Sequence, residues 1–150
     1  MMISTRGRYC LRVMIDLAEH QREGYIPMKD VAERQDISLK YLEKILPVLV
    51  KNGIIEGLQG KTGGYRLSRK PEEYTLGEIL RLTEGSLSPV SCLECGAAPC
   101  LECGAAPCDK AADCRTLPVW TELDRRINEY LNSVTVADLL RSNPNASSVS

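Results

Sequence analysis

Six of the seven cysteines of this chain lie in one short stretch, which also contains the octapeptide CLECGAAP twice in succession. Thiolates are soft ligands that select iron–sulfur clusters, zinc or copper(I). Core packing does not need so many cysteines together, so the stretch predicts a metal or cluster site without naming the metal. A thiol-rich loop that binds nothing is the alternative. The spacing is Cys92-x2-Cys95-x4-Cys100-x2-Cys103-x4-Cys108-x5-Cys114.

The rest of the sequence places these thiols in a reducing compartment. No stretch approaches the roughly 18 consecutive apolar residues that a membrane-spanning helix needs, and no apolar signal region begins the chain. We therefore expect a cytoplasmic protein whose cysteines stay reduced. We also expect no enzymatic activity, because no Ser-His-Asp set or poised carboxylate pair is evident and GKTGG (60–64) lacks the spacing of a phosphate-binding loop.

The charge is divided unevenly along the chain. The formal net charge is only −1, but residues 1–70 hold 13 Lys and Arg against 8 Asp and Glu, whereas residues 71–150 hold 6 against 12. A basic half can meet the phosphates of nucleic acid. On charge alone, chance unevenness on a solvated surface explains the division equally well.

Apolar periodicity predicts a helical protein with one hairpin. In the fourth expected helix Thr75 and Glu78 have the spacing of a capping box. Pro47 lies inside the third helix, where it removes a backbone donor and is expected to bend the helix. The expected elements are helices at 6–21, 28–36, 38–53 and 75–85, a hairpin at 54–68, and, after the cysteines, a helix at 118–132 and a short one from Thr135.

This order of elements is that of a winged helix-turn-helix, in which the third helix enters the major groove of DNA and the hairpin touches the adjacent backbone. The outward face of the third helix carries side chains that can reach phosphates and base edges, and basic residues flank it. An ordinary solvated helix face is the alternative. The predicted DNA contacts are Arg6, Arg8, Ser38, Lys40, Tyr41, Glu43, Lys44, Lys51, Lys61 and Arg66.

Four segments closely resemble the winged-helix regulators typified by IscR, NsrR and CymR, often called the Rrf-type family. They are MMISTRGRYCLRVMIDLA, ISLKYLEKIL, KNGIIEGLQGKTGGYRLSR and YTLGEIL, and the likeness extends over about residues 2–141. The run ISLKYLE followed by KTGGY is specific to that family rather than to winged helices in general. The resemblance implies a fold that is mainly α with a small β-hairpin wing, a winged helix-turn-helix followed by a long dimerisation helix.

The resemblance further implies a homodimeric transcription factor that binds double-stranded DNA at an imperfect palindrome, with the helix at 118–132 as the dimer interface. The apolar stripe of that helix is wider than a small domain needs, and Trp and Tyr are enriched at interfaces. Packing within one chain is the alternative. The stripe comprises Val119, Trp120, Leu123, Ile127, Tyr130 and Leu131.

In the regulators that this chain resembles, three cysteines about five residues apart hold an iron–sulfur cluster, with a His three positions after the last in the IscR type. Cys108 and Cys114 match two of these cysteines, but Glu102 stands in place of the first and Leu117 in place of the His. If the octapeptide arose by duplication, a single copy already supplied Cys-x2-Cys-x4-Cys-x5-Cys, four thiolates that need no His. We therefore predict Cys100, Cys103, Cys108 and Cys114 as ligands of an iron–sulfur cluster, expected to be [2Fe–2S], with [4Fe–4S] or zinc as alternatives.

The other candidate ligands have simpler interpretations. Cys92 and Cys95 would be spare thiols that lengthen the loop. Cys10 lies on the apolar face of the first helix and is expected in the core, and His20, the single His, is expected at a helix end.

These features together predict a DNA-binding regulator whose operator affinity depends on the cluster. A zinc or dithiol–disulfide switch in the loop is one alternative. Another is a regulator controlled by binding a metabolic enzyme, as CymR-type members bind a cysteine-synthesis enzyme. The expected parts are a DNA-binding domain at 1–84, a cysteine-rich loop at 85–117, the dimerisation helix and a short helix at 118–141, and a disordered tail at 142–150.

Overall fold

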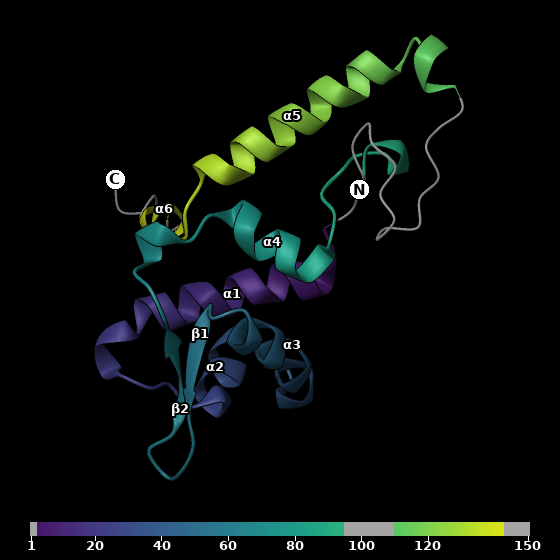
Figure 1. Cartoon of the computed structure of the whole chain (residues 1–150). Coiled ribbons are helices and arrows are strands. Elements are labelled where there is room, and N and C mark those ends of the chain that lie inside the picture. The colour runs from purple at the N-terminus through teal and green to yellow at the C-terminus, as the bar shows by residue number, and fades with distance from the viewer. Residues whose placement is uncertain (1–2, 95–109, 143–150) are drawn as a thin grey trace.

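The computed structural model describes residues 3–94 and 110–142 and has the predicted fold class, mostly helical with one small hairpin (Figure 1). Within these residues no helix is long and apolar enough to cross a membrane. The helices are α1 (Thr5–Glu19), α2 (Met28–Gln35), α3 (Leu39–Lys51), α4 (Leu76–Glu84), α5 (Leu117–Ser133) and α6 (Val136–Arg141). The strands are β1 (Ile55–Leu58) and β2 (Gly64–Leu67), and the 3-10 turns are η1 (Gln21–Glu23), η2 (Pro71–Glu73), η3 (Ser91–Leu93) and η4 (Ala111–Asp113).

Helix α1 lies at the centre of the molecule and contacts α2, α4, α6 and β2. Its apolar residues recur at helical spacing, so one face of the helix is continuously buried. Cys10 is fully buried there, and burial raises the pKa of its thiol to about 12, which keeps it a neutral core residue as predicted. The helix ends at Glu19 and His20 is its C-cap, so the predicted helix was two residues too long.

Helix α3 is set against α1 by a tight turn after α2. Asp36 ends α2 in the left-handed conformation, and Ser38 then caps α3 by accepting a hydrogen bond from the backbone N–H of Tyr41 at 3.2 Å. Helix α3 continues through Pro47, which lies on its exposed side. Its buried residues are Leu42, Ile45, Leu46 and Leu49, and the opposite face is left to solvent.

A buried carboxylate joins α1 to α2. Asp16 is 1% exposed and accepts hydrogen bonds from Arg34 at 2.7 and 3.0 Å and from the Gln35 amide at 3.0 Å. A buried charge is tolerated only when it is paired and hydrogen-bonded, so these three side chains fix how α2 lies on α1.

The hairpin pairs antiparallel in the register Ile55↔Leu67 to Leu58↔Gly64. Ile26 pairs with Tyr65 through two backbone hydrogen bonds of 2.8 Å, which ties β2 to the segment before α2. Gly64 allows this approach, because a Cβ there would collide with the Ile26 carbonyl. Strand β2 is therefore paired on both edges, with β1 on one side and Ile26 on the other.

The two later helix caps differ from each other. Thr75 caps α4 by accepting from the Glu78 N–H, but the Glu78 carboxylate binds Arg69 at 2.5 Å instead of returning to the cap. The capping box predicted there is therefore wrong in its second half. The capping box at the start of α6 is complete, with Thr135 and Asp138 satisfying each other's backbone N–H groups.

Tyr74 ties the C-terminal arm to the rest of the molecule. Its hydroxyl donates to the Ile54 carbonyl at 2.7 Å and accepts from the Arg69 N–H at 2.7 Å, and its own carbonyl accepts from the Val136 N–H at 3.0 Å. The ring is fully buried, and burial raises the pKa of the hydroxyl. The two ends of the hairpin and the start of α6 therefore meet at this one residue, which comes directly before the cap of α4.

We predict that Tyr74→Phe lowers the free energy of unfolding by about 1–3 kcal/mol, because the Ile54 carbonyl and the Arg69 N–H lose a buried partner. Chemical denaturation measures the change. Tyr25→Phe is the matched control and should unfold like the wild type, because the Tyr25 hydroxyl makes no hydrogen bond within the described residues and the ring keeps its contact with Arg66. Equal stability of the two variants would contradict the role given to the Tyr74 hydroxyl.

Candidate DNA interface and cysteine segment

The exposed face of α3, together with its cap Ser38, carries half of the residues predicted to contact DNA. Lys40, Glu43, Lys44 and Lys51 are exposed, and the three lysines form no ion pair within the described residues. Ser38 begins the face and uses its oxygen to cap the helix, which leaves its proton free to donate. The helix therefore presents unpaired cations beside one acidic side chain.

Tyr41 packs against the body of the protein and is only half exposed. Its ring meets Tyr9 edge-on, with centroids 5.3 Å apart, and the Arg12 guanidinium lies 5.3 Å from the Tyr9 centroid. Arg12 also donates to the Gln35 backbone carbonyl and to its side-chain amide. Tyr41 thus helps to position the first turn of α3. Arg12 is a neighbour of this face that the sequence analysis missed, although it follows Arg8 by one helical turn.

The arginines at the start of α1 are both exposed. Arg8 lies one helical turn before Arg12, about 40° from it around α1, and its guanidinium donates to Thr5 at 3.0 Å. Arg6 lies about 60° around the helix from Tyr9, whose ring meets Tyr41 of α3. The two arginines therefore flank the Tyr9–Arg12 side of α1 from opposite directions.

The two basic residues of the hairpin differ in their surroundings. Lys61 is exposed in the turn between β1 and β2. Arg66 forms an ion pair with its cross-strand partner Glu56 at 3.0 Å and stacks 4.5 Å from the centre of the Tyr25 ring. The positive charge of Arg66 is therefore already compensated, whereas that of Lys61 is not.

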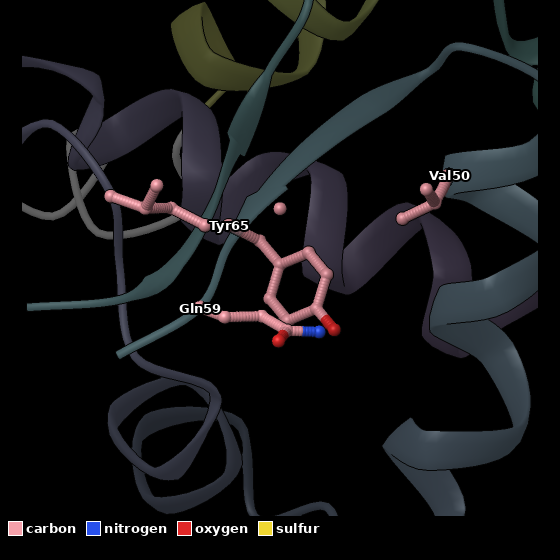
Figure 2. Close-up of a pocket in the computed structure, with 5 residues that line it drawn as sticks. Val50, Gln59 and Tyr65 are labelled. Atoms are coloured by element: carbon pink, nitrogen blue, oxygen red, sulfur yellow. The ribbon is translucent and has the colours of Figure 1, made fainter. Parts of the chain in front are cut away.

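A hollow of about 220 Å³ separates the end of α3 from the hairpin (Figure 2). Figure 2 shows the Tyr65 ring between the Gln59 side chain and Val50 of α3. Val50 and Leu58 are 42% and 45% exposed, which is unusual for aliphatic side chains so near a core. The sequence analysis did not single out this apolar hollow. Its lining residues are Val50, Gly57, Leu58, Gln59 and Tyr65.

The described residues include the two ends of the cysteine segment. Cys92 is exposed on η3, which contacts α5, and Cys114 comes three residues before the first residue of α5. Hydrogen bonds from the Thr116 hydroxyl and from the backbone N–H groups of Thr116 and Leu117 lower the pKa of the Cys114 thiol. Within the described residues no group of three or more His, Cys, Asp and Glu could hold a metal ion. The predicted ligands Cys100, Cys103 and Cys108 lie outside the described residues, as does Cys95.

Helix α5 has no fully buried side chain. The apolar stripe predicted on it divides in two. Trp120, Ile127 and Leu131 are half buried, whereas Val119, Leu123 and Tyr130 are 58%, 40% and 66% exposed. Beside the exposed group, Glu122 pairs with Arg125 and Arg126, whose hydrogen bonds lower the pKa of its carboxyl to about 2.

Residues 3–142 match the family described as "Rrf2: Iron-dependent Transcriptional regulator". The chain belongs to the Rrf2 family. It is 39% identical over 141 residues to Protein rrf2 of Nitratidesulfovibrio vulgaris, covering 94% of this chain and 88% of that one. It is 33% identical over 143 residues to the HTH-type transcriptional regulator IscR of Aliivibrio salmonicida, covering 95% and 79% of the two chains.

Two solved structures of Rrf2-family regulators have the same fold. The structure of CymR (YrzC), the global cysteine regulator of B. subtilis, gives a TM-score of 0.73 at 32% identity and covers 95% of this chain and 98% of that one. T. potens IscR gives 0.71 at 34% identity and covers 97% and 90%. The predicted family and winged-helix fold are thereby confirmed, and the chain is a DNA-binding transcriptional regulator and not an enzyme.

We predict different salt dependences of DNA binding for two basic residues. Lys44→Ala should weaken binding and reduce the slope of log affinity against log salt by about 0.9, because one phosphate contact is lost. Arg66→Ala should leave the slope unchanged, because Glu56 already compensates that charge. Fluorescence anisotropy on a duplex selected by the wild-type protein from a randomised pool measures both. Equal losses for the two variants would contradict this ranking.

Proposed function

We propose that this Rrf2-family regulator is a homodimer of the cytoplasm whose operator affinity is set by an iron–sulfur cluster bound in the cysteine-rich loop, residues 85–117. The observation that carries the proposal is the position of Cys114, directly before α5, where hydrogen bonds favour the thiolate form of its side chain. The family description "Iron-dependent" and the likeness to proteins named IscR support it.

The donor chemistry of this end of the segment fits such a cluster. Iron–sulfur clusters are bound by thiolates, and Cys114 meets a hydroxyl and two backbone N–H groups that stabilise a thiolate. Cys114 would hold the cluster together with Cys100, Cys103 and Cys108. The cluster would supply an oxidation- and iron-sensitive link that orders the loop. We favour [2Fe–2S], with [4Fe–4S] or zinc as the alternatives.

The proposed DNA-binding domain is residues 1–84. Helix α3 enters the major groove, with Lys40, Lys44 and Lys51 toward phosphates and Glu43 toward base edges. The hairpin then touches the DNA backbone beside the major groove. One strand of the DNA would therefore cross the hollow between α3 and the hairpin. Val50 and Leu58 would there contact the apolar faces of the sugars. Lys61, at the hairpin tip, would bind a phosphate.

The proposed dimer forms through α5, in the part of the chain at 118–141. Three large apolar side chains, Val119, Leu123 and Tyr130, share one face of the helix and are left exposed by the chain's own fold. A second copy of the same face would cover them. Because Cys114 is joined directly to this helix, ordering or releasing the loop would change how the two copies of α3 are held. Two half-sites must be met about one helical turn of DNA apart, so a small change there alters affinity strongly.

We predict that protein purified without oxygen is brown and contains iron and acid-labile sulfide, and that removing the cluster changes operator affinity by at least about tenfold. Cys114→Ala should lose the cluster and bind the operator like the stripped protein. Cys92→Ala, at a thiol outside the predicted ligand set, should keep the colour. Iron and sulfide analysis and anisotropy measure these outcomes.

Each alternative has its own signature in the same experiment. If the purified protein is colourless and contains zinc, the loop holds a zinc site and not an iron–sulfur cluster. Metal-free protein that changes affinity with thiol oxidation would indicate a dithiol–disulfide switch. Equal affinity of the loaded and stripped protein would exclude control by the cluster, however much iron is bound.

We predict that Leu123→Glu converts the dimer to a monomer, because it places a charge in the centre of the exposed apolar face of α5. Thr121→Glu is the matched control. Thr121 is equally exposed but lies on the other side of the helix, and the variant should stay dimeric. Size-exclusion chromatography with light scattering measures the mass. A dimeric Leu123→Glu variant would locate the interface elsewhere.

A second candidate is control by binding a metabolic enzyme. The likeness to the structure of CymR, titled a global cysteine regulator, favours it. A pull-down with the wild type and with the loop cysteines replaced distinguishes the two mechanisms. Capture of the same enzyme by both forms, together with operator binding that only the enzyme changes, would favour this second candidate.

A further inference from the structure

One arginine of α4 bridges two turns of α5. The Arg81 guanidinium donates to the side-chain oxygen of Asn128 at 2.6 Å and to that of Asn132 at 2.9 Å. The two asparagines are four residues apart and so lie on the same side of the helix. A planar guanidinium can donate to both oxygens at once, which fixes the orientation of α5 relative to α4 as well as the distance between the two helices.

The surroundings of Arg81 favour this one arrangement. The Asn128 amide group donates to the Asp124 carbonyl at 2.8 Å, which turns its oxygen toward Arg81. Gly77, one turn before Arg81 on α4, is buried, and a Cβ there would collide with the Asn132 oxygen and approach Arg81 Nη1 to 2.9 Å. The absent side chain of Gly77 therefore leaves the space in which Asn132 meets Arg81.

Backbone hydrogen bonds hold one end of the arm. The Leu76 N–H donates to the Val134 carbonyl at 2.9 Å, and Thr75 and Thr135 form a β-bridge, so the C-terminal end of α5 is held by backbone bonds. Figure 1 shows α5 running from this end past α4 and away from the DNA-binding domain. A helix held by the backbone at one end needs further attachments to fix its angle. Arg81 supplies a directional one, beside the packing of the half-buried side chains of α5 and the contact of α5 with η3.

The length of α5 amplifies changes at this attachment. At 1.5 Å per residue, Asn128 lies about 9 Å and Val119 about 22 Å from Val134. A shift of about 1 Å at Asn128 therefore moves the exposed apolar face near Val119 by about 2.5 Å. This is close to the rise of about 3.4 Å for one base pair.

We propose that Arg81 is a positioning residue that sets the angle of α5 and thereby the spacing of half-sites that the dimer accepts. The inference rests on the proposed dimerisation through α5. It adds that half-site spacing is fixed by a residue which touches neither DNA nor the partner subunit nor a cysteine ligand. Arg81 itself lies on α4, half buried.

The test compares full-length proteins on three duplexes. One is the duplex selected by the wild type from a randomised pool, and the others have one base pair inserted or removed between the half-sites. The wild type should bind the altered duplexes at least about tenfold more weakly, whereas Arg81→Met should discriminate by less than about threefold. Arg81→Lys should also discriminate weakly between the duplexes, as Arg81→Met does, because a single ammonium group cannot reproduce the two hydrogen bonds of the guanidinium.

Gly77→Ala separates positioning from folding. The added methyl displaces the ends of two flexible side chains and not the backbone, and alanine favours helix by about 1 kcal/mol over glycine. This variant should therefore be at least as stable as the wild type and yet lose spacing discrimination. Arg141→Met is the control for charge and should discriminate like the wild type, because within the described residues Arg141 pairs only with Asp138 on its own helix.

If Arg81→Met and Gly77→Ala both discriminate between the three duplexes as strongly as the wild type does, the inference is wrong and the proposed function is unaffected. A monomeric wild-type chain in light scattering would overturn the proposed function itself, and the inference with it. Loss of discrimination in the Arg81 and Gly77 variants, with dimers of normal mass, supports the inference.

Discussion

The buried Tyr74 side chain connects the parts of this molecule that must act together. Its hydroxyl donates to the Ile54 carbonyl at the start of the hairpin and accepts from the Arg69 N–H at the end of the hairpin. Its backbone carbonyl accepts a hydrogen bond from the N–H of Val136, the first residue of α6. Val136 and Ala137 of α6 are buried against the DNA-binding domain. The chain thus leaves the domain after the C-terminal end of α4 and returns to it beside the N-terminal end of the same helix. Helix α5 is therefore anchored to the domain by the backbone at its own C-terminal end.

This anchoring explains how α5 can have no fully buried side chain and still keep a defined position. Packing of an apolar face stabilises most helices in proteins. Here one part of the stripe, Trp120, Ile127 and Leu131, is half buried, and the other is exposed. The interface and the intramolecular interpretations of the stripe were framed as alternatives, but the helix has enough apolar surface for both.

The periodicity of the sequence predicted the elements well, because each depends on local rules. Ser38, Thr75 and Thr135 cap their helices as their types suggest, and the glycine-rich GKTGG closes the hairpin. Contacts between distant residues were not predictable in this way. Asp16 has no local feature that reveals its pairing with Arg34, 18 residues later. Glu78 had the right spacing for a capping box, but Arg69 provides a stronger, charged partner.

The same limit applies to the candidate sites. Tyr41 and Arg66 were predicted to contact DNA from their positions on an outward face and a hairpin, and the sequence did not reveal that each also has a partner within the chain, Tyr9 and Glu56. Their contact with DNA stays a prediction. The three cysteines predicted as ligands with Cys114 lie outside the described residues, so that part of the hypothesis stays a prediction. The hollow beside Val50 and Leu58 arises only when α3 and the hairpin are brought together.

The basic residues of the first half of the chain, residues 1–70, have two different roles. The difference decides how much of the positive charge of that half is free to bind DNA. Arginines form the internal bridges: Arg34 to Asp16, Arg66 to Glu56 and Arg69 to Glu78. A guanidinium suits this task because it donates several hydrogen bonds in a fixed plane. The lysines of α3 and the hairpin tip instead form no ion pair within the described residues. The excess of basic residues in the sequence therefore overstates the charge that is free to bind DNA. Among the proposed phosphate contacts, Lys40, Lys44, Lys51 and Lys61 keep their charge uncompensated within the described residues, whereas Arg66 does not.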